Sequence, residues 1–403
     1  MDETYDVVVV GGGAAGLSGA LSLARARRSV LVIDAGAPRN APAGHVHNYL
    51  TRDGTPPAEL AAAGRDEVAR YGGEIIDGHV DGAATDGDGF LVTLAGGRGV
   101  RARRLLVTTG LADELPDVPG VAQRWGRDVL HCPYCHGWEV RDRRIGVLAT
   151  GPTALHHAHL WRQWSPHVLL LSQGDAPAAE EAERLAARGI TVVPDPVSEL
   201  VVADDALTGV RLASGAVVAL DALVVAPRFT ARAGVLESLG LKPVDVEMAG
   251  HVVGSQVPAD PSGATAVPGV WVAGNVADVR AQVIAAAAAG ATAAAAINAD
   301  LVAEDTRHAV DAYRQQVRAM FERDGWEERY RAKPTIWSGR PNAQLVAEAG
   351  GLPPGRALDV GCGEGADAVW LAERGWHVTA VDIATTALER AAAAAGPRVA
   401  GRI

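Results

Sequence analysis

A glycine-rich loop between two apolar runs near the N-terminus constrains the fold more than any other feature of the chain. Tyr5 to Val10 is a continuous, largely β-branched run, residues 17–27 have helical spacing, and Ser29 to Ile33 forms a second strand-like run. Residues 11–16, before the helix, follow the pattern G-x-G-x-x-G. Glycines in this setting allow a tight turn, close approach of the backbone to a pyrophosphate, and close helix packing. The segment therefore predicts a βαβ unit that binds a dinucleotide.

The same order of strand, helix and strand occurs twice more along the chain. The expected elements are Arg144 to Ala149, about Thr153 to Trp164 and Val168 to Leu171 in the second unit, and Ala357 to Val360, Ala366 to Arg374 and His377 to Val381 in the third. Helices that alternate with apolar strands indicate parallel sheets covered by helices. We therefore predict an α/β protein built from three Rossmann-like domains or half-domains.

Composition excludes several classes of partner. The 403 residues include 37 basic and 48 acidic side chains, and the net charge of -11 argues against a nucleic acid or an anionic membrane surface. Three cysteines cannot form a disulfide framework. Acidic residues precede the first apolar run, unlike a signal peptide, and Val283 to Ile297 is shorter than the roughly 20 residues that a bilayer requires. We expect a soluble, cytoplasmic protein.

The first glycine loop has an acidic partner at the expected distance. Asp34 ends the second strand, 21 positions after Gly13. A carboxylate at this position can bind the hydroxyls of a ribose. Context, spacing and acid together favour a dinucleotide site over a glycine-rich turn without a ligand.

Several segments together identify which dinucleotide is expected. The loop 11–16, Asp34, residues 269–275 and residues 281–283 resemble the two FAD fingerprints of the low-molecular-weight thioredoxin reductase family, over roughly residues 4–300. In that family an acidic residue contacts the ribityl chain, where this chain has Asn275, whose amide can still bind a hydroxyl. The resemblance implies FAD contacts at Gly11, Gly13, Ala14, Ala15, Gly16, Asp34, Gly110, Gly274, Asn275, Ala281, Gln282 and Val283.

A C-x-x-C motif precedes the second βαβ unit. Cys132 and Cys135 can close a small disulfide ring, and a lowered thiol pKa would make one of them an exchange nucleophile. The resemblance implies that Cys135 lies against the flavin and that Cys132 attacks the substrate. His136 replaces the aspartate common in the family and could move the thiol proton, whereas His131 is more simply a polar loop residue. Zinc is the rival interpretation, but the only other cysteine is distant, so we expect no metal.

The second glycine loop departs from the dinucleotide pattern. Ala149 takes the place of the first glycine, Pro152 enters the loop, and residues 172–174 supply neither the acid typical of NAD sites nor the arginine typical of NADP sites. NAD(P)H therefore binds weakly through Gly151 and Ala154, or the domain is a remnant and electrons leave by another route. In the second case the protein would resemble FAD-dependent dithiol oxidases, which pass electrons to oxygen. The nearby His156, His157 and His159 are expected on a solvated face.

The third unit resembles the first motif of class I S-adenosylmethionine-dependent methyltransferases. The motif is residues 358–365, and the resemblance implies cofactor contacts from Asp359, Gly361, Gly363 and Asp382. Cys362 is then a packing residue. The sequence ends at Ile403, before further strands of such a domain, so we expect an inactive partial domain and either a gene fragment or part of a longer bifunctional protein.

The predicted organisation is a thioredoxin reductase type of fold followed by a partial methyltransferase half-domain. The expected parts are an FAD domain (1–115 and 246–304), an inserted NAD(P)H-type domain with the C-x-x-C (116–245), a helical connector (305–354) and the half-domain (355–403). The leading functional hypothesis passes electrons from NAD(P)H through FAD and the cysteines to a small-molecule or protein disulfide. A dithiol oxidase and a non-catalytic flavin-binding remnant are the alternatives, and the resemblance implies a homodimer.

Overall fold

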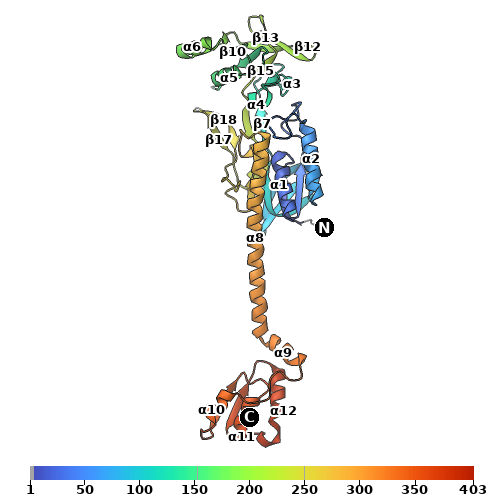
Figure 1. Cartoon of the computed structure of the whole chain (residues 1–403), viewed down its shortest axis with the longest axis vertical. Helices are drawn as coiled ribbons and strands as arrows, with labels where there is room; N and C mark the ends of the chain where they lie inside the picture. Colours follow the sequence, from blue (N-terminus) through green and yellow to red (C-terminus); the bar gives the residue numbers. More distant parts are fainter. Residues whose placement is uncertain (1–3, 152, 249) are drawn as a thin grey trace. The chain divides into compact units, whose positions relative to one another are not determined.

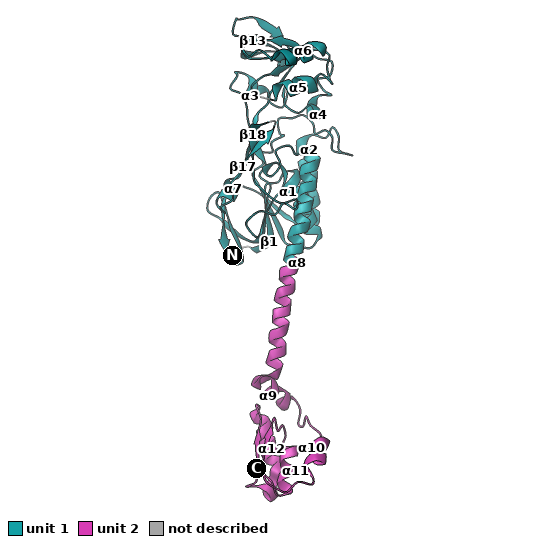
Figure 2. Ribbon diagram, turned by 90° about the vertical axis from the view of Figure 1, so that its left-hand side faces the viewer, with its two compact units in different colours: residues 1–301 teal, residues 302–403 magenta. Residues whose placement is uncertain are grey.

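The computed structural model describes residues 4–151, 153–248 and 250–403. The chain divides into two compact units, Met1–Leu301 and Val302–Ile403, which Figure 2 colours separately. The first unit contains four of the five sheets, and the second contains a single two-stranded sheet. Most of the chemistry predicted from the sequence therefore belongs to the first unit.

The largest sheet of the first unit has seven strands in the order β3-β2-β1-β6-β5-β4, with β19 paired to β6. Strands β1, β2, β3, β6 and β19 pair in parallel, and β4, β5 and β6 pair antiparallel. The bounds are β1 (Thr4–Val10), β2 (Val30–Asp34), β3 (Glu74–Asp77), β4 (Val80–Asp86), β5 (Gly89–Leu94), β6 (Gly99–Val107) and β19 (Val270–Val272).

Three helices cover one face of this sheet: α1 (Ala14–Arg25), α2 (Pro57–Arg70) and the first half of α8 (Val283–Phe321) (Figure 1). Val7 and Val9 of β1 point into this core, and their neighbours Val8 and Val10 point into the core on the opposite face. Both faces are thus buried, which explains why β1 is a continuous apolar run rather than an alternating one.

A four-stranded sheet in the order β17-β18-β16-β7 adjoins the points where the chain enters and leaves the inserted segment. Its strands are β7 (Leu111–Glu114), β16 (Arg228–Ala231), β17 (Val244–Met248) and β18 (His251–Gln256). The short helix α7 (Gly234–Glu237) follows β16 and packs against β4. The two crossing strands, β7 and β16, are therefore anchored to the first domain.

The inserted segment has a five-stranded sheet, β11-β10-β9-β15-β8, and an antiparallel one, β12-β13-β14. The elements are α3 (Val121–Arg124), β8 (Val129–Leu130), α4 (Pro133–His136), β9 (Ile145–Leu148), α5 (Ala154–Trp161), β10 (Val168–Leu171), α6 (Ala179–Ala187), β11 (Thr191–Val193), β12 (Val197–Ala203), β13 (Ala206–Leu212), β14 (Val217–Ala219) and β15 (Ala222–Val224). Every pair in the five-stranded sheet is parallel, as expected for a nucleotide-type domain.

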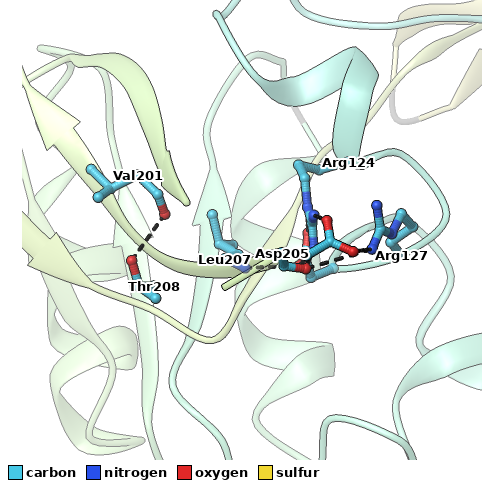
Figure 3. Close-up of polar contacts among 7 residues, drawn as sticks. Arg124, Arg127, Val201, Asp205, Leu207 and Thr208 are labelled. Atoms are coloured by element: carbon cyan, nitrogen blue, oxygen red, sulfur yellow. Dashed lines mark hydrogen bonds and ion pairs between the residues drawn. The ribbon is translucent and has the colours of Figure 1, made fainter. Parts of the chain in front are cut away.

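A buried arginine ties the β12–β13 turn to the segment before the cysteines. The Arg124 side chain is 7% exposed and binds Asp128 through two nitrogens and Asp205 through Nη1 at 2.8 Å (Figure 3). Asp128 also accepts the N–H of Leu207 at 2.9 Å. Charge-assisted bonds of this kind are directional, so the network holds residues 124–128 in one position.

The second unit contains the end of α8, a lead-in of two helices and one βαβα segment. Its elements are α9 (Arg323–Ala332), α10 (Ala343–Ala349), β20 (Arg356–Val360), α11 (Ala366–Glu373), β21 (His377–Val381) and α12 (Thr385–Val399). Strands β20 and β21 pair in parallel from Arg356 opposite His377 to Val360 opposite Val381. This arrangement is the half-sheet that the sequence predicts.

Helix α8 differs from the sequence-based expectation. The apolar stretch 283–297 and the first part of the expected connector, residues 305–321, belong to one continuous helix that ends at Phe321. By length and composition α8 is the one helix among the described residues that could cross a membrane. Its apolar part packs against the large sheet instead, with Ala293, Ile297 and Leu301 fully buried. Alanine side chains on this face allow that close approach.

Candidate active site

The first glycine loop has the geometry that close packing requires. A Cβ atom on Gly16 would lie 1.9 Å from the carbonyl oxygen of Gly11, so no other residue fits at that position. A Cβ on Gly13 would meet nothing within 4 Å. Gly13 stands at the N-cap of α1, where no side chain caps the helix and no acid occupies the first turn. The loop thus leaves open space in front of unpaired helix N–H groups, which suits a pyrophosphate.

Asp34 lies directly beside this loop. Its Oδ1 accepts the N–H groups of Gly12 at 3.1 Å and Gly36 at 3.3 Å, and its Oδ2 lies 3.1 Å from Nη1 of Arg65. The Asp34 side chain is 19% exposed. A carboxylate oxygen has two lone pairs, so the aspartate can still accept a ribose hydroxyl. The loop and Asp34 together fit the adenosine end of a dinucleotide.

The late segment predicted to contact the cofactor lies beside the first glycine loop. A Cβ on Gly290 of α8 would lie 1.9 Å from the carbonyl oxygen of Ala15, so α8 crosses α1 in direct backbone contact. Asn275, in the 3-10 helix η1 (Gly274–Val276), donates from Nδ2 to the carbonyl oxygens of Asp278 at 3.0 Å and Ala281 at 2.9 Å. Its amide therefore organises the turn into α8, a role that the motif alone did not predict.

Arg39 connects this turn to the inserted segment. Its Nη1 lies 3.4 Å from Oδ1 of Asn275, and its Nε and Nη2 bind both carboxylate oxygens of Asp113 at 2.8 and 2.6 Å. The guanidinium also stacks 5.3 Å from the ring centre of Phe229. Sequence reasoning missed Arg39, because its partners lie 74 and more positions away and no local pattern marks it.

The two predicted cysteines form a disulfide. Their Cα atoms are 5.3 Å apart, and Cys132 stands at the N-cap of the four-residue helix α4. The N–H groups of Cys135 and His136 both point to the Cys132 carbonyl oxygen at 3.2 Å. This helix is too short for a substantial macrodipole, so the surrounding side chains matter more for the thiol chemistry.

Two histidines flank the disulfide. The His131 ring lies 5.1 Å from the rings of both Phe229 and His157, and its Nδ1 is 3.1 Å from the carbonyl oxygen of Val225. Burial lowers the pKa of His131 and of His136, although the nearby Glu139 carboxylate opposes the change at His136. Both rings are therefore neutral at pH 7 and able to accept a proton.

A cavity of about 330 Å³ borders the segment on both sides of the cysteines. It is lined by Pro42, Gly44, His45, His47, Gly126, Arg127, Leu130, His136, Glu139 and Val140. The loop 46–55 closes one side, because Asn48 Nδ2 donates to the Tyr134 carbonyl oxygen at 2.5 Å and His47 Nε2 lies 3.3 Å from Glu139. Sequence reasoning predicted His136 but missed His45, His47 and Arg127, which follow no recognisable spacing.

The second unit brings its predicted residues together at the carboxyl ends of β20 and β21. The N–H of Gly363 donates to Oδ2 of Asp382, and the N–H of Ala384 donates to Oδ1 of the same carboxylate, both at 2.9 Å. Asp359 Oδ2 is buried without a hydrogen-bond partner among the described residues, and burial raises the pKa of that carboxyl. An orphaned buried oxygen at a glycine loop fits a ligand with donor groups, such as the cationic amino-acid end of S-adenosylmethionine.

Cys362 lies inside this loop but is unsuited to redox chemistry. Its side chain is buried, it has no disulfide partner among the described cysteines, and burial raises its thiol pKa to about 11. A thiol with such a pKa holds almost no thiolate at neutral pH. Its place in the fold agrees with the packing role predicted for it.

Comparison with known proteins identifies the family. Residues 5–291 match the model of pyridine nucleotide-disulphide oxidoreductases, and residues 321–400 match that of thiopurine S-methyltransferase. The chain belongs to the pyridine nucleotide-disulphide oxidoreductase family. The prediction of an oxidoreductase is confirmed, as is the resemblance in both parts of the chain. Membership implies FAD and NAD(P)H as cofactors.

Individual relatives support the same fold. Thioredoxin reductase sirT of Leptosphaeria maculans is 32% identical over 320 residues, which cover 75% of this chain and 95% of that protein. The crystal structure of HlmI is 48% identical, with a TM-score of 0.72, and the match covers 77% of this chain and 97% of HlmI. The putative thioredoxin reductase TrxB of Bacillus anthracis is 27% identical, with a TM-score of 0.68 and coverage of 75% and 99%. The predicted α/β fold class is confirmed.

For a pyridine nucleotide-disulphide oxidoreductase, this chain has an unusual second glycine loop. A Cβ on Gly151 would meet nothing within 4 Å, and Pro152 lies outside the described residues. Gln173, after β10, has a φ of 58° and accepts the N–H of Val197 at 3.2 Å through Oε1. At the position that selects NAD or NADP, the Oε1 of Gln173 is thus engaged within the protein, whereas its Nε2 is buried without a hydrogen-bond partner among the described residues.

The histidines at the start of α5 are not all on a solvated face, so that prediction was wrong in part. His156 is exposed, whereas His157 and His159 are half-buried. His157 Nδ1 and His159 Nε2 have no hydrogen-bond partner among the described residues. Burial, followed by the neighbouring His131 and His156, lowers the pKa of His157 to about 4. The His157 ring packs against the ring of His131, which explains why His157 is not on a solvated face.

Proposed function

We propose that this chain is an FAD-dependent thiol-disulfide oxidoreductase in which Cys132 and Cys135 exchange electrons with a dithiol or disulfide substrate. The observation that carries the proposal is the Cys132–Cys135 disulfide, which His131 and His136 flank in the sequence, next to segments that line a small cavity. When bound, FAD supplies a two-electron acceptor or donor. Gly13, Asp34 and the turn organised by Asn275 are the groups that would hold it.

The two cysteines and His136 have different roles in the exchange with a dithiol. One substrate thiolate attacks a sulfur of the Cys132–Cys135 bond and releases the other cysteine as a thiolate. The second substrate thiolate then displaces the first cysteine, so that a substrate disulfide forms and both enzyme cysteines are reduced. In this proposal His136, which follows Cys135 in the sequence, accepts the substrate proton and returns it to the leaving thiolate. The resemblance assigns Cys132 to the substrate and Cys135 to the flavin.

The second glycine loop favours oxidation of a dithiol, with oxygen as the final acceptor. Ala149 at the first glycine position and the engaged Gln173 leave no acid or arginine to bind the ribose of a pyridine nucleotide. Oxygen would accept the two electrons and two protons of the dithiol and leave as hydrogen peroxide.

Reduction of a disulfide by NAD(P)H is the second candidate. It is supported by the intact parallel sheet of the inserted domain and by relatives such as sirT, whose name is thioredoxin reductase. In that direction a bound NAD(P)H would supply two electrons as a hydride, and the reduced Cys132 and Cys135 would convert the substrate disulfide into a dithiol. Gly151 and Ala154 would then contact the nucleotide.

Anaerobic reduction of the purified holoprotein distinguishes the two directions. For the oxidase we expect NADH and NADPH to leave the flavin absorbance near 450 nm unchanged, a dithiol to bleach it, and admission of oxygen to restore it with release of hydrogen peroxide. Rapid bleaching by a nicotinamide instead would establish the reductase.

Cysteine variants test the exchange itself. Cys132→Ser and Cys135→Ser should each lower dithiol turnover by at least about a thousandfold, because the disulfide can no longer form. Cys362→Ser is the matched control, since it removes a buried thiol in the other unit. Unchanged turnover in Cys132→Ser would defeat the cysteine mechanism and favour a non-catalytic flavin-binding protein.

For the second unit we propose that it binds S-adenosylmethionine without methylating an acceptor. Asp382 and Asp359, with Gly361 and Gly363, would supply the cofactor end of the site, and β20 and β21 form the only sheet among the described residues of this unit. Equilibrium dialysis of the full chain with S-adenosylmethionine tests this. Methyl transfer by the chain would overturn the second half of the proposal.

The remaining proposals concern assembly and location. Family membership supports a homodimer in the cytoplasm that acts on a thiol substrate. Light scattering of the purified protein should give a mass near twice the 41.6 kDa of one chain. A mass of 41.6 kDa would exclude the dimer.

A further inference from the structure

The cavity beside the disulfide has the size of a small-molecule site. Its volume is about 330 Å³, at the lower end of the range of ligand pockets. Three segments line it: residues 42–47, 126–130 and 136–140. The last two flank the C-x-x-C motif, and the first comes from a loop of the other domain. A compact metabolite fits such a space, whereas a folded protein could present only a single side chain to it.

Glu139 is the acidic residue in the lining of this cavity, and its carboxylate already contacts His47. Glu139 Oε1 lies 3.3 Å from His47 Nε2, and the other nitrogen of His47 lies 3.4 Å from Asp53. His45 packs against His47 with ring centres 6.1 Å apart. The acidic side of the cavity is thus engaged within the protein.

Among the residues that line the cavity, Arg127 has a permanent positive charge, and an ion pair holds its side chain. One terminal nitrogen, Nη2, binds the Asp205 carboxylate, which the buried Arg124 also binds (Figure 3). Asp205 therefore fixes the direction of the Arg127 side chain from the β12–β13 turn. Within residues 4–151, 153–248 and 250–403, no hydrogen bond involves Nε or Nη1 of Arg127.

An unengaged guanidinium donor in a cavity calls for an anion. The N–H groups of Nη1 can bind a carboxylate oxygen through a charge-assisted hydrogen bond. The cavity thus combines a carboxylate-binding group with two lining segments that flank the C-x-x-C motif.

We propose that this cavity is the substrate pocket and that its substrate is a small-molecule dithiol, or the corresponding disulfide, that carries a carboxylate bound by Arg127. The inference rests on the proposed thiol-disulfide chemistry and specifies its substrate class. Arg127 is a specificity-determining residue, and it takes no part in sulfur exchange.

Two probes that differ only at the acidic group test this proposal. Dihydrolipoate and dihydrolipoamide carry the same dithiol, but the first ends in a carboxylate and the second in a neutral amide. We expect the holoprotein to oxidise dihydrolipoate with a kcat/KM about tenfold higher, through a lower KM, because charge-assisted bonds are stronger than neutral ones. Arg127→Gln should remove this preference with little change in kcat for dihydrolipoamide, and Arg127→Lys should keep part of it.

Arg141→Gln is the matched control. Arg141 is near the cysteines and stacks 4.1 Å from the Trp138 ring centre, but it does not line the cavity. This variant has the same change of charge, so it should keep the preference for dihydrolipoate. Melting temperature and flavin content of each variant establish that it is folded.

Binding of the oxidised probes separates this inference from the proposed function. Calorimetry should show that lipoate binds the holoprotein about tenfold more tightly than lipoamide, and that Arg127→Gln abolishes the difference. Equal affinities, or a preference that survives Arg127→Gln, would overturn the inference. If both dithiols are oxidised equally, the thiol-disulfide function stands and this inference fails. If neither is oxidised while lipoate binds through Arg127, the function fails and the pocket stands.

Discussion

The two βαβ units within Met1–Leu301 share one topology but differ in how the glycine loop relates to its surroundings. In the first, Gly16 touches the backbone of Gly11, Asp34 bonds to the loop, and α8 crosses α1 at Gly290. In the second, Ala149 and Ala154 stand at the positions of Gly11 and Gly16, and a Cβ on Gly151, like one on Gly13, would meet nothing within 4 Å. The glycines that the packing of the first loop requires are thus absent from the second.

This difference teaches that a glycine motif combines two requirements that can be separated. Some of its glycines are needed by the packing of the protein itself, and others only by a ligand. Gly16 belongs to the first kind and Gly13 to the second. Gly151 has the same open surroundings as Gly13, so packing does not require a glycine there. The predictions below test this separation.

The largest effect is expected from Gly16→Ala. The new Cβ would lie 1.9 Å from the Gly11 carbonyl oxygen, so the loop or α1 must move. We expect a loss of about 3–5 kcal/mol in the free energy of unfolding and a protein that retains little flavin. Denaturant unfolding and the ratio of absorbance at 450 and 280 nm measure the two effects. A stable, yellow variant would show that the loop is not packed as described.

Gly13→Ala should separate binding from folding. Its backbone φ of -78° and ψ of -174° suit alanine, and a Cβ there meets no protein atom within 4 Å. The apoprotein should therefore keep its stability to within about 0.5 kcal/mol, while the affinity for FAD falls by about tenfold or more. Fluorescence titration of the apoprotein with FAD gives the affinity. Unchanged FAD affinity would place the pyrophosphate elsewhere.

The sequence predicted local structure better than it predicted the site. Strands at 168–171 and 377–381 match β10 and β21 residue for residue, because a short apolar, β-branched run with turn residues at its ends is typical of a strand. His47 and Asn48 were missed because they reach the cysteine segment only through long-range folding, and Arg127 because Asp205, which binds it, is 78 positions away. The solvated face expected for His157 was wrong for the same reason: its partner, His131, is 26 positions away.

A smaller, pH-dependent effect should distinguish the second βαβ unit from the first. His157 has a pKa of about 4 in the folded protein, against 6.5 when exposed. The unfolded chain therefore binds a proton first, so this group lowers stability as pH falls from 6.5 to about 4 and has no further effect below that range. Between about pH 7 and pH 5 the loss is about 2 kcal/mol.

His157→Leu should remove this contribution, whereas His156→Leu should keep most of it, because burial is the largest cause of the lowered pKa of His157. The measurement is the free energy of unfolding at about pH 7 and pH 5 for the three proteins. Parallel pH dependence in the wild type and in His157→Leu would mean that the ring is solvated in solution.

The smallest effect on stability is expected from Gly151→Ala, and it bears most directly on the direction of the reaction. Because a Cβ on Gly151 has no neighbour within 4 Å, the free energy of unfolding should change by less than about 0.5 kcal/mol. Dithiol-driven bleaching of the flavin should also be unchanged, since that route does not use the second loop. The informative measurement is bleaching by NADPH before and after the substitution. If the wild type is bleached by NADPH and Gly151→Ala is not, the loop binds a nucleotide despite its altered pattern, and the dithiol oxidase gives way to the reductase.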